Sequence, residues 1–129
     1  IIVAIILKNM KNNMNVHLYE KSYHKSHFLK EVSKKLNLNT MVFQKNIFEI
    51  KNLETGTIMS RAFKPMPVVL ELVYENFSKY KNLIFFMGKS GKKIFENSKK
   101  NWELEYIEKK SLTSKDSFLI NIKKIKKKN

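Results

Sequence analysis

The sequence has no cysteine, one arginine (Arg61), two alanines and only three histidines among its 129 residues. The absence of cysteine excludes disulfide frameworks, thiolate zinc sites, cysteine nucleophiles and redox CxxC motifs. It also favours a reducing compartment. The histidines, His17, His24 and His27, lie in one short region, which leaves little material for a histidine metal cage elsewhere. The apolar run at 1–7 is too short to cross a bilayer, which takes about 20 residues.

Positive charge is abundant, and almost all of it is lysine. The chain carries 26 basic and 11 acidic side chains, a formal net charge of +15, and 25 of the basic residues are lysines. Lysine, asparagine and isoleucine have A/T-rich codons, so part of this bias reflects a genome. The chain remains strongly basic even without the lysine-rich tail at 121–129. A polyanionic partner is therefore expected, nucleic acid before membrane.

The pattern of apolar residues predicts strands and helices in alternation. Short strands are expected at 15–20, 40–44, 57–63 and 82–87, the last covered on both faces. Amphipathic helices are expected at 22–38, capped by Ser22, and at 68–80 with Pro67 as the first helical residue, followed by a short helix that ends at Lys100. Between them, 52–56 is expected to be a turn in which Gly56 can take a positive φ.

The chain is expected to end in two strands, 102–107 and 118–122, that form an antiparallel hairpin, with a frayed lysine tail at 123–128. The alternation of strand and helix predicts an α/β fold with a mostly parallel open sheet. We expect a single domain over 1–129, a length at which roughly two thirds of the unfolded surface is buried without disulfides or metal.

Two side chains stand at predicted strand ends. Glu20 ends the first clear strand, where nucleotide-binding α/β folds place an acidic residue about 20 positions after a glycine-rich turn to bind ribose hydroxyls. That turn would then precede Ile1, and 1–7 would be the helix after it. Carboxylates also end many strands by chance.

Arg61 is the one guanidinium among 25 lysines, which indicates a position that needs a planar multidentate donor. A structural ion pair with Glu20 or Glu49 is the alternative. The three histidines fit surface or phosphate-contacting positions better than metal ligands. The segment 88–91 lacks the spacing of a Walker phosphate loop.

Several segments together resemble a known family. The segment at 57–63, TIMSRAF, resembles the (V/I)-x-S-R-A-(F/L) strand of the bacterial ribosomal RNA small subunit methyltransferase G family, also called the glucose-inhibited division protein B family. The segments HLYEK at 17–21, KSHFLK at 25–30, QKNIFE at 44–49 and FFMGK at 85–89 match further family elements in order. The run at 1–5 resembles the segment directly after the family's G-x-G-x-G-x-P-G loop, so the chain resembles an N-terminally truncated member.

The resemblance implies a Rossmann-like S-adenosylmethionine-dependent methyltransferase fold without its first strand and glycine-rich loop. That strand would lie at the centre of the sheet, between the strands that end at Glu20 and Arg61. The implied activity is methylation of guanine N7 in 16S ribosomal RNA, by a cytoplasmic monomer that acts on the RNA or the small-subunit precursor and not at a membrane. This chain alone is expected to be inactive.

The resemblance also assigns residues. Glu20 would bind the ribose hydroxyls of S-adenosylmethionine, Arg61 would lie at the cofactor and acceptor site, and the adenine side would be lined by Asn46, Ile47 and Phe48. Asn46 and Phe48 depart from the arginine and the carboxylate usual in the family. No catalytic acid–base residue and no metal are expected, since guanine N7 needs no deprotonation. The expected RNA contacts are Lys64, Lys89 and a stacking Phe63.

Two other function classes remain open from the residues alone. A non-catalytic basic RNA-binding module would show salt-sensitive RNA binding and no response to S-adenosylmethionine. A dinucleotide-dependent oxidoreductase could use Glu20 for ribose binding, although the SRAF segment argues against it.

Overall fold

The computed structural model of the chain describes residues 1–61, 64–112 and 114–129. These residues form two compact units, Ile1–Ile50 and Lys51–Asn129, and each is described by itself. The single domain expected over 1–129 stays a prediction. In the described part of the chain, no helix is long and apolar enough to cross a membrane.

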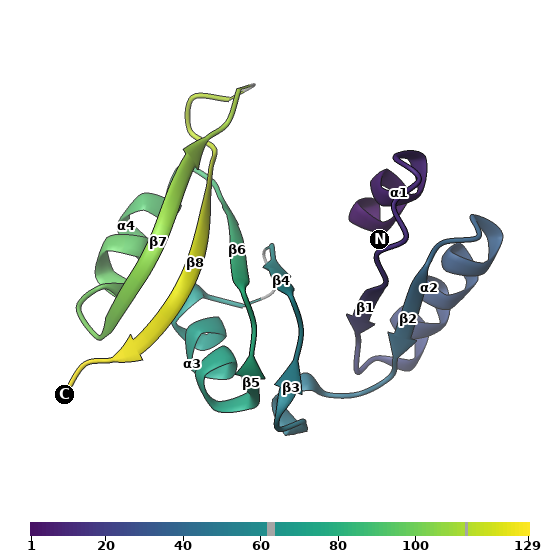
Figure 1. Cartoon of the computed structure of the whole chain (residues 1–129), viewed down its shortest axis with the longest axis horizontal. Coiled ribbons are helices and arrows are strands. Elements are labelled where there is room, and N and C mark those ends of the chain that lie inside the picture. Colours follow the sequence, from purple (N-terminus) through teal and green to yellow (C-terminus); the bar gives the residue numbers. More distant parts are fainter. Residues whose placement is uncertain (62–63, 113) are drawn as a thin grey trace. The chain divides into compact units, whose positions relative to one another are not determined.

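The first unit is a parallel strand pair with two helices and a short 3₁₀ helix (Figure 1). Strands β1 and β2 pair in parallel from Val16↔Thr40 to Tyr19↔Phe43. The expected strands and the helix between them are confirmed, and the apolar start of the chain is helical. The elements are α1 (Ile2–Asn9), β1 (Val16–Tyr19), α2 (Tyr23–Lys35), β2 (Thr40–Phe43) and η1 (Ile47–Glu49).

Helix α2 begins as expected but buries different residues. The Ser22 hydroxyl accepts a hydrogen bond from the Lys25 N–H at 3.4 Å and so caps the helix. The apolar stripe expected for this amphipathic helix consists of Phe28, Leu29, Val32, Leu36 and Leu38. Of these, Phe28 is 63% exposed, whereas Ser26 and Ser33 are buried. The most buried side chains of α2 are therefore serines and not members of the apolar stripe.

The second unit is a four-stranded mixed sheet in the order β4-β6-β8-β7, beside a small parallel pair, β3-β5. Strand β4 runs parallel to β6, while β8 runs antiparallel to both β6 and β7. This confirms the α/β class and the C-terminal hairpin. The elements are β3 (Leu53–Glu54), β4 (Thr57–Ser60), α3 (Met66–Asn76), β5 (Phe77–Lys79), β6 (Asn82–Met87), α4 (Gly91–Ser98), β7 (Trp102–Lys110) and β8 (Phe118–Lys127).

Both strands that the resemblance places beside an absent central strand are edge strands. Within the described residues, β1 has β2 as its strand neighbour, and β4 has β6. One edge of each strand therefore presents backbone groups that have no strand partner.

Two local expectations are wrong. Helix α3 ends at Asn76 instead of Tyr80, because Phe77 takes an extended conformation and its segment pairs with β3. In the turn before β4, Asn52 has the left-handed conformation (φ 57°), and no glycine in the described chain has a positive φ. Asn tolerates this region better than most residues because its short side chain can bond locally.

The core of the second unit lies on one face of its sheet, under α3 and α4 (Figure 1). Leu70 and Val73 of α3 pack there with Leu83 and Phe85 of β6, and all four are buried. On the opposite face, Phe86 is 43% exposed. The expectation that 82–87 is covered on both faces is therefore wrong for the described residues.

The lysine tail is ordered, which corrects the expectation of a frayed end. Strand β8 continues to Lys127, whose ammonium lies 3.0 Å from the Glu71 carboxylate and 5.6 Å from the ring centres of both Tyr74 and Trp102. The hydrogen bond to Glu71 raises the pKa of Lys127. The ion pair and the two cation–π contacts fix the end of the chain against α3 and β7.

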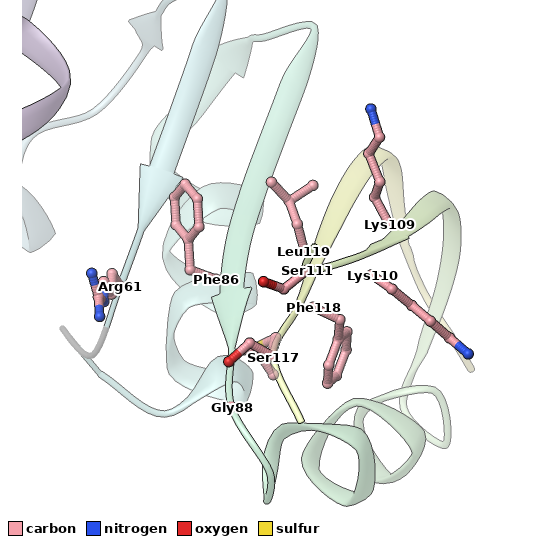
Figure 2. A pocket seen from close by; sticks show the side chains of 10 residues that line it. Arg61, Phe86, Gly88, Lys109, Lys110, Ser111, Ser117, Phe118 and Leu119 are labelled. Carbon is pink, nitrogen blue, oxygen red and sulfur yellow. The ribbon is translucent and has the colours of Figure 1, made fainter. Parts of the chain in front are cut away.

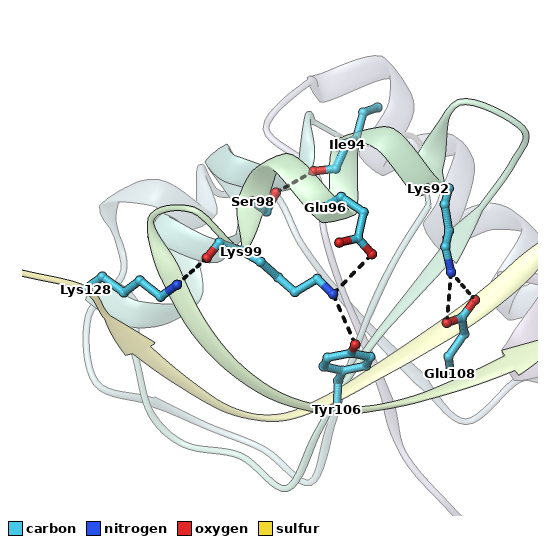
Figure 3. A network of polar contacts seen from close by, with 8 residues as sticks. All are labelled: Lys92, Ile94, Glu96, Ser98, Lys99, Tyr106, Glu108 and Lys128. Atoms are coloured by element: carbon cyan, nitrogen blue, oxygen red, sulfur yellow. Dashed lines mark hydrogen bonds and ion pairs between the residues drawn. The ribbon is translucent and has the colours of Figure 1, made fainter.

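Polar contacts also join α4 to the hairpin (Figure 3). Lys92 donates to both carboxylate oxygens of Glu108, at 3.1 and 3.2 Å. Lys99 donates to the Tyr106 hydroxyl at 3.2 Å and pairs with Glu96 at 3.1 Å, and these bonds, with that to Tyr106 contributing most, raise its pKa. Both contacts hold β7 against α4 at neutral pH, where lysine is charged.

The close approach of α4 to the end of β6 requires glycine at its first residue. A Cβ atom at Gly91 would lie 2.7 Å from the Met87 Cβ, whereas one at Gly88 would meet nothing within 4 Å. We expect Gly91→Ala to lower the free energy of unfolding by about 1–3 kcal/mol, because the clash is with a rigid part of Met87. Gly88→Ala is the matched control, and equal urea midpoints for both variants would contradict the prediction.

Candidate functional site

Glu20 lies at the carboxyl end of β1 and is held in place by local bonds. Its backbone N–H donates to the Phe43 carbonyl at 3.0 Å, and its Oε1 accepts the Ser22 N–H at 3.0 Å. In the described part of the chain, the second carboxylate oxygen, Oε2, has no hydrogen-bond partner. The side chain is half-buried. A fixed carboxylate with one free oxygen at a parallel strand end can accept hydrogen bonds from hydroxyl groups.

A hollow of about 400 Å³ opens beside Glu20, between this carboxylate and the first turns of α2. Phe28 and Leu29 give it apolar walls, and His24 and Lys25 give it polar ones. It therefore combines a carboxylate with an apolar surface, as sites for nucleoside-like ligands do.

The segment at 46–48 follows β2 at the same end of the parallel pair. The Asn46 side chain accepts the Phe48 N–H at 3.1 Å and caps η1, so its amide oxygen is used within the segment. Ile47 is half-buried, and Phe48 is 36% exposed. Because β1 and β2 are parallel, the structure places Glu20 and these three residues at one sheet edge.

In the second unit, Arg61 directly follows β4 and is exposed. It lines a pocket of about 540 Å³ at the carboxyl ends of β4 and β6, which we call the hairpin pocket (Figure 2). No ion pair within the described residues includes Arg61, while a pairing with Glu20 or Glu49 would involve the other unit and stays untested. The pocket is lined by Arg61, Phe86, Lys109, Lys110, Phe118 and Leu119, among others.

The remaining predicted RNA contacts are less well defined. Lys64 lies between β4 and α3, and Lys89 lies in the turn between β6 and α4; both are exposed. Neither lines the hairpin pocket, although Gly88, next to Lys89, does. Phe63 lies outside the described residues, so its expected stacking role stays a prediction.

Sequence reasoning missed the hairpin residues of this pocket. Lys109 and Leu119 come from β7 and β8, and only the pairing register brings them beside Phe86. The sequence offered no signal for them, since residues 83–87 are all apolar and no polar side chain marks the exposed face of this strand.

The histidines make local contacts. His27 lies 3.3 Å from the Glu31 carboxylate one turn later on α2, and its ring stacks on Tyr23. The described residues contain no cluster of three His, Cys, Asp or Glu side chains that could hold a metal ion.

Comparison with solved structures shows the fold. The chain superposes on a putative rRNA methylase from Clostridium thermocellum with a TM-score of 0.58 and 11% identity, over 88% of this chain and 74% of that one. It superposes on M. capricolum TrmK, solved with S-adenosylhomocysteine, with a TM-score of 0.56 and 19% identity, over 92% of this chain and 55% of that one. The fold is thus that of Rossmann-like methyltransferases.

Comparison of sequences shows the family. The family model for rRNA small subunit methyltransferase G (GidB) matches residues 1–122. The chain is also 62% identical to the ribosomal RNA small subunit methyltransferase G of Pelagibacter ubique (strain HTCC1062) over all 129 of its residues. It spans 61% of the length of that relative. The resemblance seen in the sequence is confirmed: the chain belongs to the rRNA small subunit methyltransferase G family.

Proposed function

We propose that this chain supplies cofactor-binding and RNA-binding residues of an enzyme that uses S-adenosylmethionine to methylate guanine N7 in 16S ribosomal RNA. The observation that carries the proposal is the 62% identity, over the whole chain, to a relative with that family name. The family match does not support the oxidoreductase alternative.

The residues of the first unit fit the ribose and adenine parts of the cofactor. The free Oε2 of Glu20 is an acceptor for ribose hydroxyls, and the fixed Oε1 keeps the carboxylate oriented. Ile47 and Phe48 offer apolar surface at the same sheet edge for a purine ring. When bound, S-adenosylmethionine supplies an electrophilic methyl group.

The reaction asks for positioning and not for an acid–base pair. Guanine N7 carries a lone pair and attacks without losing a proton, so holding the base in line with the methyl group contributes most of the acceleration. Arg61 can hold acceptor groups at the strand edge through its planar donors. No residue of the chain is assigned as a general base.

The partner we propose is 16S ribosomal RNA or a precursor of the small subunit, met in the cytoplasm by a monomer. Lys64, Lys89 and Phe63 are the proposed contacts beyond the strand ends, where ammonium groups meet phosphates and a ring meets a base. The formal charge of +15 supports a polyanionic substrate.

A non-catalytic RNA-binding module is the second candidate. It is favoured by the high positive charge of the chain. Such a chain would bind RNA with a strong salt dependence and would not need a cofactor.

A hybrid enzyme tests the proposal. The part of the Pelagibacter relative that this chain matches is replaced by the 129 residues, and the hybrid is incubated with S-adenosylmethionine and unmethylated small subunits. We expect 7-methylguanine in 16S RNA, detected by mass spectrometry of nucleosides, and none from the 129 residues alone, which have no glycine-rich loop. The intact relative is the positive control. A folded hybrid that binds RNA but transfers no methyl group would favour the binding module.

A further inference from the structure

Three neighbouring strands place a ring, an aliphatic side chain and a cation in one row. Phe86 of β6 is the partner of Leu119 in β8, and Leu119 is the partner of Lys109 in β7. Directly paired residues point to the same face of a sheet. Strands lie about 4.8 Å apart, so Lys109 stands roughly 10 Å from Phe86 across the row, within reach of its long side chain.

Phe86 is an exposed ring that no helix of the second unit covers, as far as the described residues show. It is 43% exposed although its neighbour Phe85 is buried, because α3 and α4 lie on the other face. Within the described residues, no aromatic or cationic side chain contacts its ring. A free ring face beside cations is the surface on which unpaired bases stack.

Cations stand on both sides of this ring. Figure 2 shows Phe86 between Arg61, at the end of β4, and the hairpin that carries Lys109. Lys110 points away from Lys109 in the same view, as expected for adjacent strand residues. Arg61 and Lys109 thus flank the ring and could meet the phosphates on either side of one nucleotide.

The position of Lys109 is fixed by its neighbour. Glu108 is held on the α4 face by Lys92, so the next side chain must point to the opposite face (Figure 3). The Ser111 N–H donates to the Ser117 carbonyl at 2.9 Å and closes the hairpin just beyond. Lys109 therefore lies at a strand end whose backbone is held in place by this hydrogen bond.

We propose that the hairpin pocket binds one unpaired nucleotide of the RNA substrate, with its base stacked on Phe86 and a neighbouring phosphate held by Lys109. This inference rests on the proposed function for the identity of the polyanion. It assigns the base-binding face to the end of β6 and a phosphate contact to the hairpin.

The test is binding of a labelled single-stranded RNA ten nucleotides long to the full 129-residue chain, followed by fluorescence anisotropy at several salt concentrations. We expect Phe86→Leu to weaken binding about tenfold, the usual scale for loss of one stacked base, and Phe86→Tyr to bind like the unchanged chain. Binding to duplex RNA of equal length, whose bases are paired, should change little in either variant.

Lysine variants test the phosphate contact separately. Lys109→Gln should weaken binding and lower the salt slope by about 0.7, the share of one phosphate on a single strand. Lys79→Gln, in β5 of the separate β3-β5 pair, is the matched control and removes the same charge. If the two variants weaken binding equally, Lys109 contributes only to the overall positive charge. Its assignment as a phosphate contact would then be wrong.

Two further outcomes would overturn the inference. One is unchanged single-strand binding by a folded Phe86→Leu variant, and the other is a change in oligomeric state, which would make Phe86 a protein contact. The hybrid assay keeps the two proposals apart. If the hybrid transfers methyl groups and Phe86→Leu does not change its RNA binding, only the proposal for the hairpin pocket is wrong. If Phe86→Leu weakens RNA binding but the hybrid transfers no methyl group, only the proposed enzymatic function is wrong.

Discussion

Replacing Glu20 by glutamine in the hybrid enzyme is expected to weaken S-adenosylmethionine binding about ten- to a hundredfold. Hydrogen bonds to a charged group contribute roughly 1.5–3 kcal/mol, and the change removes the charge while it keeps the shape of the side chain. It also turns one acceptor oxygen into a donor, which cannot accept from a ribose hydroxyl. The measurement is calorimetric titration of the cofactor.

Glu31→Gln is the control for this change. Glu31 lies on α2 in the same unit, is exposed, and pairs with His27, so it loses the same charge away from the strand edge. Its cofactor affinity should match that of the unchanged hybrid. If the Glu20 and Glu31 variants bind the cofactor equally well, Glu20 does not hold the ribose.

Leu70→Ala is expected to lower the free energy of unfolding by about 2–5 kcal/mol. Leu70 is fully buried at the centre of α3 and packs in the core with both β6 and β8, so its removal leaves a cavity. Alanine favours the helix, hence the loss comes from packing and not from helix propensity. Urea denaturation followed by circular dichroism measures it.

Val68→Ala, two residues earlier in the same helix, is the matched control. Val68 is an exposed residue of α3, so its truncation should change the unfolding free energy by about 0.5 kcal/mol or less. Similar losses for the two variants would mean that Leu70 does not lie in a close-packed core.

The main elements could be predicted because their signals are local. Ser22 caps α2, and alternation marks β1, so both follow from residues a few positions apart. Strand β5 could not be predicted, since the helical pattern continues past Asn76 and only the pairing of Phe77 with Leu53 overrides it. Tertiary pairing commonly decides such short extended segments.

In the candidate site, too, the residues with a local sequence signal could be predicted and those placed by strand pairing could not. Glu20 and Arg61 could be found because each ends a strand, and a strand end is visible in the sequence. Phe86 and Lys109 are brought together by the β6-β8-β7 register, which depends on strand lengths and on a shift between Glu105 and Tyr106. No local pattern carries that information.

Lys127 and Tyr74 both contact the ring of Trp102, which makes this tryptophan a fluorescent reporter of folding. Trp102 is the single tryptophan and is only 4% exposed, so its emission spectrum reports the packing of Lys51–Asn129 and not of Ile1–Ile50. Far-ultraviolet circular dichroism, by contrast, senses helices in both units. In one guanidinium titration, coincident transitions of the two signals would mean that the units unfold together, and separate transitions would mean that each is a cooperative folding unit by itself.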